Sequence, residues 1–95
     1  MSKPLQGEIA LVTGASRGIG AAIADTLAAQ GATVIGTATS ASGAAAIGER
    51  LAANGGHGRE LNVTDAAAVD ALIDAIGKEF GAVSILVNNA GITRD

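Results

Sequence analysis

Three glycines with a fixed spacing follow the first apolar run of the chain, at residues 9–12. Gly14 allows a tight turn out of a strand, Gly18 lets the backbone approach a phosphate closely, and Gly20 lets the following helix pack closely. The first turn of that helix offers unpaired N–H groups and the positive end of its dipole to an anion. The spacing is Gly-x-x-x-Gly-x-Gly, and no Gly-Lys-Ser/Thr follows, so this is not a Walker A loop. We interpret the segment as a nucleotide-phosphate site, with a glycine-rich turn that binds nothing as the alternative.

The end of the second apolar run carries hydroxyl groups where an NAD site needs a carboxylate. Such sites place Asp or Glu about 20 residues beyond the glycine turn, where it holds the ribose hydroxyls. Residues 36–40 read Gly-Thr-Ala-Thr-Ser instead. Hydroxyls together with the nearby Arg17 suit a 2′-phosphate, which a carboxylate would repel. The segment therefore favours NADP, and Asp in place of Thr37 or Ala38 should shift the preference toward NADH. Thr39 and the serine after it have a second role open to them, as caps of the next helix.

Polar side chains also follow the third and fourth apolar runs. Asn62 and Asp65 are placed to contact an adenine edge, and both residue types are also typical of turns and helix caps. For Asp65 we favour the cap, whereas for Asn62 the two roles are equally supported. The fourth run leads into Asn-Asn-Ala-Gly at residues 88–91. The small residues there leave room for a flat ligand against the backbone.

The composition limits the class of protein. Ninety-five residues form at most one small domain, and 48% hydrophobic residues are too many for a disordered chain. The absence of cysteine excludes disulfides and cysteine-based zinc sites, and fits a cytoplasmic protein. The net charge of −3 without a basic cluster gives no indication of nucleic-acid binding. No segment reads as a signal peptide or a membrane span, so we expect no membrane partner.

Strands and helices are expected to alternate along the chain. The apolar runs predict strands at 8–12, 32–36 and 83–87 and a short third strand within 57–63, with Leu61 and Val63 pointing inward. Periodicity and capping residues predict helices at about 18–30, 42–53 and 65–80. In the first helix we expect a buried stripe of Ile19, Ile23 and Leu27, with close contacts filled by Ala22, Ala24 and Ala28. In the third helix we expect a stripe that ends at Phe80. The lone histidine, at position 57, is expected in a solvated turn.

This alternation predicts an α/β fold. It is a partial doubly wound parallel sheet, Rossmann-like, with strand order 3-2-1-4 and helices on both faces. Gly14 and residues 88–91 then flank one crevice, at the point where the strand order reverses. The fourth strand would be an apolar edge, with Val83, Ile85 and Val87 on one face and Leu86 on the other. Since natural proteins avoid such an edge, we expect residues 1–95 to be the N-terminal part of one NADP-binding domain.

Three motifs, in this order and spacing, resemble the short-chain dehydrogenase/reductase family: Thr-Gly-Ala-Ser-Arg-Gly-Ile-Gly at 13–20, Asn-Val-Thr-Asp at 62–65, and Asn-Asn-Ala-Gly at 88–91. Residues 36–40 and 86–95 are more particularly similar to the members that reduce 3-oxoacyl groups on acyl-carrier protein. The resemblance implies that NADP(H) is bound along the carboxyl ends of the strands. The cofactor-binding candidates are Gly14, Ala15, Ser16, Arg17, Gly18, Ile19, Gly20, Thr39, Asn62, Val63, Asn89, Ala90 and Gly91.

The resemblance also implies a reaction and partners. A longer parent enzyme would reduce a 3-oxoacyl thioester in fatty acid biosynthesis, in the cytoplasm, as a homo-oligomer, commonly a tetramer. The family's catalytic Ser and Tyr-x-x-x-Lys have no counterpart here, because the chain contains no tyrosine. We therefore assign no catalytic and no metal-binding residue, and expect the 95-residue chain to be inactive alone. The alternatives are another short-chain dehydrogenase with a small carbonyl or alcohol substrate, and a non-catalytic nucleotide-binding module complete at 95 residues. A methyltransferase-like nucleoside site is disfavoured, because the second strand does not end in an acidic residue.

Overall fold

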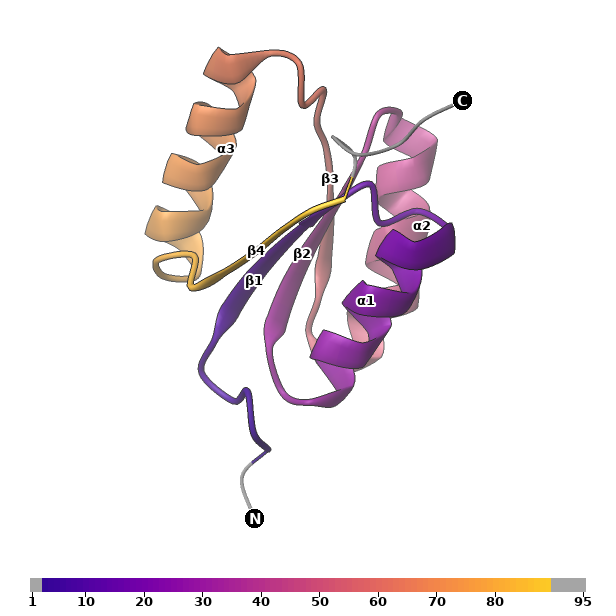
Figure 1. Ribbon diagram of the computed structural model, residues 1–95, viewed down its shortest axis with the longest axis vertical. Coiled ribbons are helices and arrows are strands. Elements are labelled where there is room, and N and C mark those ends of the chain that lie inside the picture. The colour runs from indigo at the N-terminus through magenta and orange to yellow at the C-terminus, as the bar shows by residue number, and fades with distance from the viewer. Residues whose placement is uncertain (1–2, 90–95) are drawn as a thin grey trace.

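The computed structural model describes residues 3–89, in which four strands alternate with helices (Figure 1). Their order is β1 (Ile9–Thr13), α1 (Gly18–Ala29), β2 (Thr33–Ala38), α2 (Ala41–Leu51), the 3₁₀ turn η1 (Ala52–Asn54), β3 (His57–Glu60), α3 (Ala66–Glu79) and β4 (Ile85–Asn88). Each expected element is present, with bounds shifted by one to three residues at most ends.

The four strands form one parallel sheet in the order β3-β2-β1-β4. The prediction of a doubly wound α/β arrangement with this strand order is confirmed. Leu11 lies opposite Ile35 of β2 and Leu86 of β4, so β1 is one of the two inner strands of the described sheet. All five residues of β1 are buried, which explains its continuous apolar run. The strand order reverses between β1 and β4, and an open crevice at their carboxyl ends follows from that reversal.

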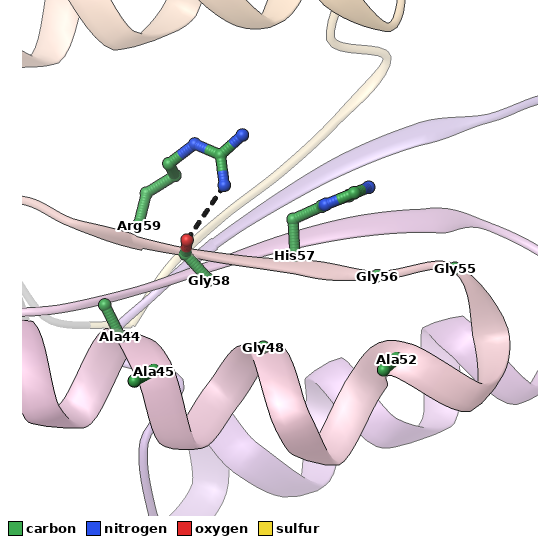
Figure 2. A pocket seen from close by; sticks show the side chains of 9 residues that line it. All are labelled: Ala44, Ala45, Gly48, Ala52, Gly55, Gly56, His57, Gly58 and Arg59. Atoms are coloured by element: carbon green, nitrogen blue, oxygen red, sulfur yellow. Dashed lines mark hydrogen bonds between the residues drawn. The ribbon is translucent and has the colours of Figure 1, made fainter.

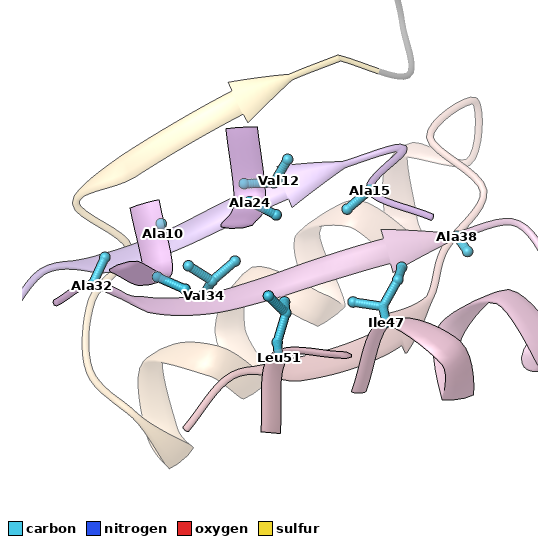
Figure 3. Close-up of a cluster of buried hydrophobic side chains, with 10 residues drawn as sticks. Ala10, Val12, Ala15, Ala24, Ala32, Val34, Ala38, Ile47 and Leu51 are labelled. Atoms are coloured by element: carbon cyan, nitrogen blue, oxygen red, sulfur yellow. The ribbon is translucent and has the colours of Figure 1, made fainter. Parts of the chain in front are cut away.

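Helices cover both faces of the sheet, as expected. In Figure 1, α1 and α2 lie on one side of the strands and α3 lies on the other. The α1/α2 face encloses a buried cluster built largely from small residues (Figure 3). Its members are Ala10, Val12, Ala15, Ala24, Ala28, Ala32, Val34, Ala38, Ile47 and Leu51. The α3 face encloses a smaller cluster, Ile9, Leu11, Ile35 and Ile76. Successive residues of β1 therefore serve opposite faces.

The buried stripe of α1 differs from the expected one. Gly20, Ala24 and Ala28 face the sheet, whereas Ile19 is 72% exposed and Ile23 is only half-buried. Small side chains allow α1 to approach the sheet closely, and the larger ones are left on its flank. The expectation was therefore wrong for Ile19, whereas Ile23 and Leu27 pack against the buried cluster and Ala24 and Ala28 make the expected close contacts.

Helix α2 forms despite its two internal glycines, for reasons visible at both ends of the helix. The Gly43 N–H donates to Ser40 Oγ at 3.1 Å, which caps the first turn. Ile47 and Leu51 are fully buried at the other end. A Cβ on Gly58 of β3 would collide with the Ala44 carbonyl oxygen, so this strand lies directly against the helix.

Two expectations about the outer strands were wrong in detail. His57 is not in a solvated turn: it belongs to β3, and its ring packs on Phe80 with the centroids 4.6 Å apart. Val83 precedes β4 and packs with the α3-side cluster, whereas Ile85 and Val87 pack on the α1/α2 side. Leu86 is 59% exposed at the edge of the described sheet. Within residues 3–89, every helix is too short or too polar to cross a membrane.

Candidate functional site

The turn between β1 and α1 is shaped by its glycines. Gly14 and Gly18 have φ angles of 65° and 67°, in the left-handed region that side chains rarely adopt. Gly20 has an ordinary conformation but no room. A Cβ there would overlap the Gly14 carbonyl oxygen and lie 2.7 Å from Asn89 Nδ2. The three glycines are thus required by geometry, and the third of them brings α1 against the loop itself.

Helix α1 begins without a side-chain cap. Its N-cap residue, Arg17, has an extended backbone and makes no capping hydrogen bond from its side chain. By contrast, Ser40 caps α2, and Asp65 caps α3 by accepting from the Ala68 N–H at 3.1 Å. The first N–H groups of a helix have no partner within the helix. An anion in front of α1 would satisfy them and would lie at the positive end of the helix dipole.

A cavity of about 500 Å³ opens in front of this helix. Ser16, Arg17, Gly18 and Ile19 are exposed along it. Its full lining is Gly14, Ser16, Arg17, Gly18, Ile19, Ala38, Thr39 and Asn89. Residues from the glycine turn, the end of β2 and the end of β4 therefore meet at one place. Two other candidates, Ala15 and Gly20, are buried beneath the loop rather than exposed to the cavity.

A second cavity of about 210 Å³ adjoins the first and shares Gly14, Ala38 and Thr39 with it. Asn62 and Val63 lie on its wall, together with Thr37, Leu61 and Thr64. Among the described residues that line the two cavities, the only charged one is Arg17. The carboxylate-free surface expected from the sequence is therefore present.

Asn62 has a structural role as well as a place in the cavity. Its side-chain oxygen accepts from the Thr64 N–H at 3.0 Å and from Thr64 Oγ1 at 2.7 Å. Asp65 begins α3 as its cap, as favoured from the sequence. These bonds fix the loop after β3 and hold Asn62 at the wall.

The end of β4 is tied to the glycine turn. The Asn89 side-chain amide donates to the Gly14 carbonyl oxygen at 3.1 Å, and Thr13 Oγ1 donates to Asn88 Oδ1 at 3.3 Å. The expectation that these two segments flank one crevice is thereby met. The candidates Ala90 and Gly91 lie outside the described residues.

The hydroxyl-bearing segment at residues 36–40 divides into a buried and an exposed part, because β2 extends through Ala38, two residues beyond the expected end of the strand. Thr37 is 1% exposed and Ala38 is 6% exposed, so an aspartate at either position would bury an unpaired carboxylate. Thr39 is exposed on the walls of both cavities and is the residue at which a charge can act on a ligand. Ser40 is engaged as the cap of α2.

One residue at the site was missed by sequence reasoning. Arg50, in the last turn of α2, donates from Nη2 to the Ala15 carbonyl oxygen at 2.9 Å and from Nε to Asp25 Oδ1 at 3.0 Å. Local sequence gives no indication of this contact, because it joins residues 35 positions apart.

A further cavity of about 530 Å³ lies between α2 and β3, away from the glycine turn (Figure 2). Small side chains of α2 and the glycines around β3 form its walls. Its one cation, Arg59, is engaged with the Gly58 carbonyl oxygen at 2.9 Å and with Glu79 at 3.3 Å. The His57 ring points away from α2 in Figure 2. The two side chains of this cavity that could do chemistry are therefore either paired or directed away from α2, and we assign the cavity no chemistry.

The described residues form a parallel α/β domain with a glycine-rich turn at the point where the strand order reverses. The sequence profile of the short chain dehydrogenase family matches residues 8–95, and the chain belongs to that family. It is 67% identical over 90 residues to the 3-oxoacyl-[acyl-carrier-protein] reductase FabG of Escherichia coli, covering 95% of this chain and 36% of that protein. The FabG proteins of Vibrio harveyi and Pseudomonas aeruginosa are 65% identical over 91 residues and 59% identical over 93 residues. These matches cover 96% of this chain and 37% and 38% of those proteins, so the chain spans little more than a third of their length.

Proposed function

We propose that the protein carrying this chain is an NADPH-dependent 3-oxoacyl-[acyl-carrier-protein] reductase of fatty acid biosynthesis. Residues 1–95 would be the N-terminal part of its cofactor-binding domain. The observation that carries this proposal is the combination of a carboxylate-free crevice and 67% identity to a protein of that name. The proposal includes a substrate carried by acyl-carrier protein, as the names of such relatives say, and a cytoplasmic homo-oligomer, as the family resemblance implies.

The chain's residues fit a phosphorylated dinucleotide. The uncapped start of α1 and the exposed turn from Ser16 to Gly18 suit the diphosphate, since they offer N–H groups and a positive dipole end. Arg17 and Thr39 line the same cavity and suit a 2′-phosphate, as a cation and a hydroxyl group. The smaller cavity beside Asn62 and Val63, of about 210 Å³, suits the adenine ring in position and in volume.

When bound, NADPH supplies the hydride that reduces the carbonyl carbon. The contribution of this chain is to hold the cofactor and to fix its position. Asn89, tied to the Gly14 carbonyl, would support the ribose at the open side of the crevice. Neither a tyrosine nor a lysine lines the two cavities among the described residues, and the proposal assigns protonation of the alkoxide to residues outside these cavities.

The test is turnover by the full-length protein with an acetoacetyl thioester and either NADPH or NADH. We expect oxidation of NADPH with a kcat/KM at least about tenfold above that with NADH, because a charge-assisted contact to the 2′-phosphate contributes about that much. Turnover of small ketones or sugars without turnover of the thioester would instead support another short-chain dehydrogenase. Dinucleotide binding without any turnover would contradict the enzyme assignment.

A further inference from the structure

Arg50 connects three parts of the domain that have to keep their relative positions. It projects from the last turn of α2, pairs with Asp25 on α1, and donates to the Ala15 carbonyl oxygen in the glycine turn. Its side chain is 32% exposed, and that of Asp25 is 52% exposed. Two of the guanidinium nitrogens are used at once, in a fixed fork that a lysine cannot reproduce.

Ala15 is held from several directions. Its N–H donates to the Thr37 carbonyl of β2 at 2.8 Å, and its methyl group is fully buried in the cluster with Ile47. The Ala15 carbonyl oxygen that accepts from Arg50 belongs to the same peptide group as the Ser16 N–H. The peptide between Ala15 and Ser16 is trans and planar, so the Ser16 N–H points to the side opposite to the Ala15 carbonyl. With the carbonyl held toward α2, this N–H is directed away from α2, and Ser16 itself lines the 500 Å³ cavity.

We propose that Arg50 is a positioning residue for the glycine turn, which fixes the Ala15–Ser16 peptide with its N–H available to a bound phosphate group. Arg50 does not line the cavity, so it acts through the loop and not by touching the ligand. This inference rests on the proposed dinucleotide site. Without Arg50 the loop would sample peptide orientations that present a carbonyl oxygen to the phosphate, and affinity would fall.

The test compares variants of the full-length protein by NADPH fluorescence titration and by steady-state kinetics. Arg50→Met keeps most of the apolar stem and removes both donors. We expect about a tenfold rise in Kd and in KM for NADPH at unchanged kcat. This is the size expected for the loss of one charge-assisted hydrogen bond, the one from the Ser16 N–H to the phosphate. Arg50→Lys keeps the charge and one donor and should give an intermediate rise of about threefold. Asp25→Asn is the matched control, because it weakens the ion pair and leaves the bond to Ala15, and it should change Kd by less than about twofold.

The outcomes separate this proposal from the function on which it rests. If the unmodified protein binds no dinucleotide, the proposed function fails, and the positioning role fails with it. If the unmodified protein binds NADPH and Arg50→Met binds it equally well, only the positioning role is overturned. A variant that merely folds less well would show fewer binding sites per chain and a lower apparent kcat at unchanged KM, which would also contradict the proposal. Equal effects of Asp25→Asn and Arg50→Met would assign the role to the ion pair and not to the loop contact.

Discussion

The two faces of the sheet are packed with side chains of different size, and the α1/α2 face contributes more of the crevice than the α3 face. The α1/α2 face is packed with alanines and glycines that let helices approach the strands closely. The α3 face is packed with larger residues, Leu11, Ile35 and Ile76 among them. The glycine turn belongs to the first face, because Ala15 is part of its buried cluster. The second face touches the crevice through the short loop that begins at Asn62.

The backbone of the glycine turn is thus part of the closely packed α1/α2 face and not a loop that lies outside the core. On the α1/α2 face, we expect that adding or removing a single methyl group shifts the backbone of the glycine turn, which the ligand is expected to contact. On the α3 face, similar changes should alter stability and leave the crevice unchanged. The following variants of the full-length protein test whether changes on the two faces differ in their effect on NADPH affinity.

The largest effect is expected from Gly20→Ala. The added methyl group would overlap the Gly14 carbonyl oxygen and crowd Asn89 Nδ2, so the glycine turn must shift. We expect NADPH affinity to fall about 100-fold or more, measured by fluorescence titration. Gly77→Ala on α3 is the matched control, since nothing lies within 4 Å of the new methyl group. It should raise helix propensity and stabilise the protein by up to about 1 kcal/mol in urea unfolding. Retention of NADPH affinity in Gly20→Ala would refute the close-packing account.

A smaller and more discriminating effect is expected from core truncations on the two faces. Ile47 and Ile76 are both almost fully buried, at 0% and 1% exposed, and truncation of either to alanine should cost about 2–5 kcal/mol. Ile47 packs beside Gly36 and Ala15 under the glycine turn, whereas Ile76 packs on the opposite face. Under conditions where both variants remain folded, Ile47→Ala should raise the Kd for NADPH several-fold, and Ile76→Ala should leave it unchanged. Equal changes in Kd would show that the two faces do not differ in their support of the site.

Much of the fold was predictable because buried parallel strands have a strong sequence pattern. The strand order was predicted from the alternation of apolar runs with helical segments, together with the right-handed crossovers of doubly wound sheets. The close packing of α1 through Gly20 was predictable from the glycine spacing, but the 72% exposure of Ile19 was not predictable from hydrophobicity. Size complementarity between a helix and a sheet depends on both partners, and a single segment does not contain that information.

The residues that line the candidate site were predictable from the sequence, but the residue that contacts the glycine turn from α2 was not. The glycine turn, Thr39 and Asn62 were identified from residue type and position, and the structure brings them to two adjoining cavities. Arg50 was not identified, because its contact with Ala15 exists only once α2 lies beside the turn. The difference between the buried Thr37 and the exposed Thr39 was also beyond the sequence, since both follow the same apolar run.

We propose that the end of β2 and Arg17, which line the same cavity, receive the 2′-phosphate of NADP(H). The most direct measurement is the ratio of the Kd values for NADH and NADPH in the full-length protein and in Thr39→Asp, with Thr39→Asn as an uncharged control of the same shape. Thr39 is exposed on the walls of both cavities, so a carboxylate there would repel the phosphate without being buried. We expect the unmodified protein to favour NADPH, the aspartate variant to lose that preference by about tenfold or more, and the asparagine variant to keep most of it. An equal ratio in the aspartate and asparagine variants would contradict the assignment of this crevice to NADP(H).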